Sequence, residues 1–202
     1  MTSSDRSTPS GELLKVRQFC TPLFSVTCTL FQIMSWRPKE IRQSPHRRSS
    51  FGDVESSLLA SMHETCSRTL NILFDLYPVA VVGQILDGDV NNTIECDNII
   101  ANILVDGLID EKVRVRLLKL LYSVVKLLPS MSAKSSTRLS SFFAKANIST
   151  ALQDLLLSGP VGDRSGTNGN YEDELSAHMI QSIVDYSRKI LMEMKSFQDI
   201  TN

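Results

Sequence analysis

The chain has 202 residues, a formal net charge of -1 at pH 7 and a hydrophobic share of 42%. This charge balance argues against a protein whose main task is to coat nucleic acid, because such proteins are normally strongly basic. The apolar share is ordinary for a globular chain, and the length suits one sizeable domain, or one domain with flexible ends.

A polar segment opens the chain. Residues 1–10 are rich in serine and threonine, and we expect them to be disordered. Residues 11–34 predict a helical segment with Pro22 in the first turn of its second helix, but their β-branched residues suit a strand nearly as well, so both alternatives stay open. The uncharged stretch at 19–34 is too short to span a bilayer and lacks the cleavage site of a signal peptide, so we expect no membrane span.

Residues 35–50 differ from their neighbours and predict a basic linker or exposed loop. They contain five lysines and arginines, together with prolines and serines. Arg47 and Arg48 come directly before Ser49 and Ser50, an arrangement that the acidic groove of a basophilic kinase would bind. Ser49 and Ser50 are therefore candidate phosphorylation sites.

A helical core is predicted over residues 51–157, beginning with a long helix from Asp53 to Tyr77. Proline lacks the N–H group that a helix interior needs but fits a first helical turn, so Pro78 ends this helix and starts a short apolar one to Leu86. The predicted buried face of the long helix consists of Leu58, Leu59, Met62, Cys66, Leu70, Leu73 and Leu76.

Two helices joined by a short corner follow, at about 93–106 and 111–128. The first is apolar over most of its circumference and the second over about half, as expected for a helical hairpin whose outer faces meet further helices. Gly107 is predicted to supply a left-handed residue that ends the first helix, Asp110 to cap the second, and Pro129 to stop it.

The stretch at about 91–129, with its Asp-containing corner and the segment "DEKVRVRLLKLL", resembles an armadillo- or HEAT-type helical repeat. The resemblance implies an all-α fold made of a short stack of helical hairpins. An irregular helical bundle is the alternative. The function that the resemblance implies is that of a scaffold or adaptor that binds another protein, or of a fragment of a longer solenoid protein.

The C-terminal third predicts further helices. After a loop beyond Pro129 we expect a helix at 139–146, and then one capped by Asn147 or Ser149 that ends near 157. Residues 158–170 hold four glycines and a proline and predict a flexible loop. Residues 171–202 predict the last helix, to about Phe197, and a polar tail.

Cysteine and histidine residues are widely spaced and form no recognisable site. The four cysteines, at 20, 28, 66 and 96, show no CxxC spacing and are interpreted as buried, reduced thiols of a cytoplasmic or nuclear protein. His63 and Cys66 share one helix, but two ligands do not make a zinc site. We therefore predict a non-enzymatic protein with no catalytic, metal or cofactor residues. A small all-α enzyme, the alternative, would bring His63, His178 and an acid together.

A row of cations on the second hairpin helix is the candidate binding surface. Lys112, Arg116, Lys119 and Lys126 have spacings that place them on one helix face, with Arg114 nearby. The simplest interpretation is an ordinary solvated face. The functional alternative is a docking strip for an acidic protein partner. Nucleic acid bound by the basic face at 112–126 is less favoured, because interleaved aromatic residues are almost absent.

Overall fold

The structure is a computed structural model that describes residues 26–36, 53–87, 96–130, 133–144, 146–157 and 171–201. Throughout these ranges the regular secondary structure is helical, so the prediction of an all-α chain is confirmed. The helices are Val26–Ser35, α3 (Asp53–Leu76), α4 (Pro78–Asp87), α5 (Cys96–Val105), α6 (Glu111–Lys126), the 3-10 helix η1 (Leu128–Ser130), α7 (Ala133–Ala144), α8 (Ala146–Leu157) and α9 (Tyr171–Thr201).

Several sequence-based predictions fall outside the described residues. They are the disordered segment at 1–10, the N-terminal part of 11–34, most of the basic linker, the candidate phosphorylation sites Ser49 and Ser50, and the Gly-rich loop at 158–170. The choice between helix and strand at 11–34 is decided for its described part, which is helical from Val26.

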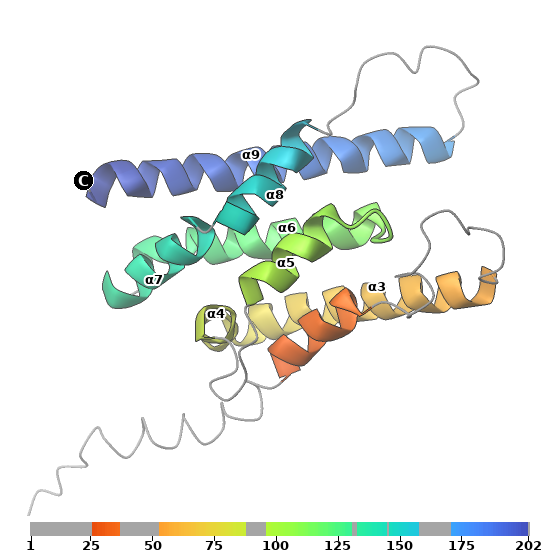
Figure 1. Cartoon of the computed structure of the whole chain (residues 1–202), viewed down its shortest axis with the longest axis horizontal. Coiled ribbons are helices and arrows are strands. Elements are labelled where there is room, and N and C mark those ends of the chain that lie inside the picture. Colours follow the sequence, from red (N-terminus) through yellow and green to blue (C-terminus); the bar gives the residue numbers. More distant parts are fainter. Residues whose placement is uncertain are drawn as a thin grey trace, which may run out of the picture.

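The helices form two layers (Figure 1). In one layer α3, α6 and α9 lie side by side, with α6 in the middle and in contact with both neighbours. In the other, α5 packs on α8, and the helix Val26–Ser35 reaches the start of α5 through the side chains of Cys28 and Cys96. The lengths of the α-helices vary from 10 to 31 residues, so the described residues do not show a regular solenoid of equal repeats.

α6 contributes more buried side chains than any other described helix because it has neighbours on three sides. Its apolar residues face α3, α9 and the second layer, and they share one core with α5. α5 contacts α8 more extensively than it contacts α6, so the predicted hairpin seam is only part of the packing. The buried residues of α6 are Val113, Leu117, Leu118, Leu120, Leu121, Val124 and Val125.

The bounds of α3 agree with the prediction, but part of its predicted buried face is wrong. Leu58 and Leu76 are 62% and 63% exposed, whereas His63 and Ser67 are buried. The face that α3 buries is therefore rotated relative to the predicted one, and its residues Cys66 and Leu70 share the core with Phe31 and Met34 of the helix Val26–Ser35. The buried Ser67 hydroxyl donates to the Glu64 carbonyl at 2.9 Å, which satisfies its hydrogen-bonding need.

The corner between α5 and α6 differs from the prediction in how it is closed. Gly107 does not adopt the left-handed conformation. Instead the Asp106 carboxylate accepts a hydrogen bond from the Leu108 amide at 2.8 Å, and the Ile109 amide donates to the Asp106 carbonyl at 3.1 Å. Ile109 is buried in the core. An Asp side chain thus supplies the turn hydrogen bond for which the sequence suggested a glycine.

Three boundaries in the C-terminal third differ from the prediction. α7 begins at Ala133 rather than at 139, and inside this helix the Ser141 hydroxyl donates to the Thr137 carbonyl at 2.9 Å. α8 begins at Ala146, so Asn147 lies in its first turn and bonds the Asn98 side chain of α5 instead of capping the helix. α9 extends to Thr201, through the predicted tail.

Candidate partner-binding surface

The outward face of α6 carries the four cations that the sequence singled out. Lys112, Arg116, Lys119 and Lys126 lie opposite the buried residues of this helix, between the flanking helices α3 and α9. We call these four residues the α6 strip. The structure therefore places all four on one surface, but it gives them different surroundings.

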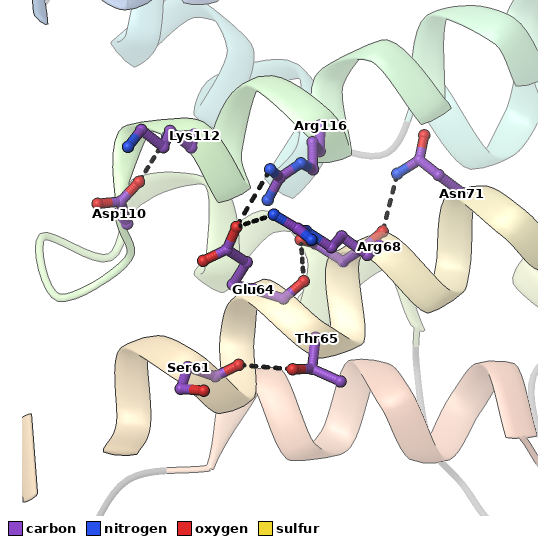
Figure 2. Close-up of polar contacts among 9 residues, drawn as sticks. Ser61, Glu64, Thr65, Arg68, Asn71, Asp110, Lys112 and Arg116 are labelled. Carbon is purple, nitrogen blue, oxygen red and sulfur yellow. Dashed lines mark hydrogen bonds and ion pairs between the residues drawn. The ribbon is translucent and has the colours of Figure 1, made fainter. Parts of the chain in front are cut away.

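The first turn of α6 is fixed by its cap. The Asp110 side chain accepts a hydrogen bond from the backbone N–H of Lys112 at 2.7 Å, which confirms the predicted N-cap (Figure 2). Because this bond uses the backbone, the ammonium group of Lys112 is left exposed. A carboxylate at this end also favours the helix dipole.

Arg116 is tied to the neighbouring helix α3 (Figure 2). Its guanidinium lies 3.3 Å from the Glu64 carboxylate, which also accepts a bond from Arg68 at 2.7 Å. Arg68, and less strongly Arg116, hold the pKa of Glu64 below its ordinary value of 4.5. Part of the charge of Arg116 is thus neutralised within the chain, and the pair links α3 to α6.

Lys126 is tied to the other neighbour, α9. Its ammonium group pairs with the Glu193 carboxylate and lies 5.5 Å from the ring centre of Tyr122. The bond to Glu193 raises the pKa of Lys126 above 10.5. Tyr122 in turn lies 5.9 Å from Tyr186 of α9, ring centre to ring centre. Aromatic side chains therefore flank the C-terminal half of the strip.

Lys112 and Lys119 are the two exposed members with no ion pair in the described part of the chain. They are seven residues apart, which is about two helical turns, so their side chains project from the same side. Arg116 and Lys126, by contrast, share their charge with Glu64 and Glu193, and the Asp110 carboxylate adds a negative charge beside the N-terminal end of the strip. The surface that can attract an anionic partner is therefore narrower than the row that the sequence suggested.

Arg114, which the sequence placed near the strip, has a structural role. Its guanidinium donates to the carbonyls of Asp106 at 2.8 Å and Ile109 at 3.4 Å, so it holds the corner between α5 and α6. Burial lowers the pKa of Arg114 below its ordinary value, although the nearby acids act in the opposite direction. It is therefore not part of the candidate surface.

The histidines that an enzyme would need together are not brought together. His63 is fully buried on α3, whereas His178 is exposed on α9, and α6 lies between these two helices (Figure 1). Among the described residues no group of three histidines, cysteines or acids has the geometry to hold a metal ion.

Among the described residues, one bent pair of helices is the only candidate for a membrane span. In the described ranges no single helix is both long and apolar enough to cross a bilayer. The helices Ser56–Leu76 and Pro78–Leu86 are long and apolar enough only when they are counted together, and the chain bends by 118° between them.

Comparison with protein-family models, curated proteins and solved structures finds no match for this chain.

Two acidic residues of this surface were missed by sequence reasoning. Glu64 lies four residues before Arg68 on one helix, a spacing that signals a local ion pair, but nothing local indicates that it also meets Arg116. Glu193 meets Lys126 across 67 residues of sequence, and no local pattern predicts such a contact.

Proposed function

We propose that this chain is a non-enzymatic scaffold or adaptor that binds an acidic segment of a partner protein on the α6 strip. The observation that supports the proposal most directly is the exposure of Lys112 and Lys119, whose ammonium groups form no ion pair among the described residues. Complementary charge on a partner would increase the association rate and the specificity of binding.

A protein partner fits this surface better than nucleic acid. Glu64 and Glu193 stand on either side of the strip, where they would repel a continuous phosphate backbone. An acidic peptide can place its carboxylates at the lysines and avoid these two positions. The net charge of the whole chain, -1, also supplies no general attraction to nucleic acid.

The layered arrangement supports a scaffold role in a second way. In the layer α3, α6 and α9, neighbouring members are separated in the chain by two other α-helices, and α5 and α8 show the same separation in the second layer. We take this recurrence as support for a short armadillo- or HEAT-like stack. Such stacks present elongated surfaces, which suit protein binding.

Affinity capture with two charge-reversed baits tests the proposal. The first bait is the full chain with Lys112→Glu and Lys119→Glu. The matched control is the full chain with Arg188→Glu and Lys195→Glu, which makes the same charge change at exposed residues of α9. Lys195 is nine residues from Tyr186, about two and a half turns, so it lies on the side of α9 away from α6.

We expect both baits to melt within about 2 °C of the unaltered chain, since exposed charges contribute little to stability. Proteins captured by the unaltered chain should be lost from the first bait by about tenfold, retained by the control, and released by raised salt. Equal capture by both altered baits would contradict the proposal and leave the strip an ordinary solvated face.

A further inference from the structure

Two cysteines from distant parts of the chain meet in the second helical layer. Cys28 lies on the helix Val26–Ser35, and Cys96 is the first residue of α5. Their sulfur atoms are 3.7 Å apart although 68 positions separate the two residues in sequence. Both side chains are about 95% buried, and neither is in a disulfide. The α6 strip does not involve either residue.

The separation of the two sulfurs is close to that needed for a covalent bond. A disulfide requires about 2.05 Å between sulfurs, so the two atoms need to approach by roughly 1.7 Å. Side-chain rotation and a small displacement of a ten-residue helix can supply such a movement. Cys66 provides a comparison within the same chain, because it is also a buried thiol but lies on another helix, α3.

We propose that Cys28 and Cys96 form a redox modification site that hydrogen peroxide converts into an intramolecular disulfide. One thiol, as the thiolate, attacks a peroxide oxygen, the O–O bond breaks, and sulfenic acid and water result. The second thiol then attacks the sulfenic sulfur, the S–S bond forms, and a second water leaves. In total, two thiols and one peroxide give one disulfide and two waters, so sulfur is oxidised and the peroxide is reduced.

Peroxide can reach this site because the helix that carries Cys28 borders solvent. Val26 and Trp36, at the two ends of this segment, are 41% and 51% exposed, and a short helix at the edge of a layer opens locally more readily than a central one. Peroxide is of similar size to water, so a small opening admits it. The neighbouring thiol then traps the sulfenic acid before a second oxidant molecule can reach it.

The disulfide would attach the helix Val26–Ser35 covalently to α5. It would close a loop of 68 positions, and a long closed loop restricts the unfolded chain strongly. We therefore expect oxidation to raise the melting temperature of the full chain by roughly 5–10 °C and a reductant to reverse the rise. In a reducing compartment the bond would be transient, as cytosolic disulfides generally are.

Peroxide titration of the purified full chain tests the site. Reduced protein is treated with hydrogen peroxide, remaining thiols are blocked, and peptides are mapped by mass spectrometry without reduction. We expect a Cys28–Cys96 linked peptide as the main product and a loss of two thiols per chain. Cys66→Ser is the matched control and should leave this product unchanged, whereas Cys28→Ser and Cys96→Ser should each abolish it.

Three other outcomes would overturn the proposal. Cys28 and Cys96 could each be oxidised separately to sulfinic or sulfonic acid, or either residue could be linked mainly to Cys20 or Cys66. The third outcome is that both thiols stay unreacted at peroxide concentrations that oxidise free glutathione. Because the linked peptide is sought in the unaltered chain, a serine variant that failed to fold would not affect this decision.

Discussion

Truncation of Leu121 is the most direct test of the core built around α6. Leu121 is fully buried among residues that are buried as well, and it belongs to a helix with packed neighbours on three sides. Leu121→Ala removes three carbon atoms, which at about 0.8 kcal/mol each amounts to about 2.4 kcal/mol of lost burial. A residual cavity of roughly 50 Å³, at about 24 cal/mol per Å³, adds about 1.2 kcal/mol.

We therefore expect Leu121→Ala to lower the free energy of unfolding by about 3–4 kcal/mol and the melting temperature by roughly 10 °C. Urea unfolding followed by far-ultraviolet circular dichroism measures the change. Leu58→Ala is the matched control, since the same truncation at a side chain that is 62% exposed should cost no more than about 0.5 kcal/mol. Similar losses in the two variants would refute the placement of Leu121 at the centre of the core.

Two further predictions concern polar contacts around α6. Asp110→Ala should lower the free energy of unfolding by about 1 kcal/mol through loss of the N-cap, and Asp110→Asn by less, because asparagine still accepts the bond. An equal loss in both variants would contradict the capping role. For Glu64, a native pKa held below 4.5 means that its stabilising contribution is present above pH 4.5 and is lost as the pH falls through the native pKa. Glu64→Gln should therefore melt below the unaltered chain at pH 7, with a difference that shrinks toward acid pH, and a difference that grows there would contradict the pairing with Arg68 and Arg116.

Helix positions were predictable wherever local signals agreed. For α6, hydrophobic periodicity, the cap at Asp110 and the stop at Pro129 all indicate the same helix, and the structure has it at Glu111–Lys126. Pro78 likewise marks the boundary between α3 and α4. These signals act within a few residues of the chain, so a single sequence contains them.

The direction in which a helix faces was less predictable, because it depends on the neighbours. α3 carries apolar residues around much of its circumference, and the helices packed against it decide that His63 is buried and Leu58 is not. The corner at Gly107 shows the same limit on a smaller scale, since an Asp side chain supplied the turn contact. Contacts such as Lys126 with Glu193 and Cys28 with Cys96 link positions 67 and 68 apart, which no periodicity reports.

The division of the α6 strip into paired and unpaired cations has a consequence for the partner. A partner that binds Lys112 and Lys119 breaks no ion pair that the described residues show, whereas one that binds Arg116 must compete with Glu64. The two lysines lie about 10.5 Å apart along the helix axis, at 1.5 Å per residue. An extended acidic segment spans this distance with carboxylates about three residues apart, at roughly 3.3 Å per residue. Such a segment can therefore bind without loosening the contacts that join α6 to α3 and α9, so binding and stability should respond to different substitutions.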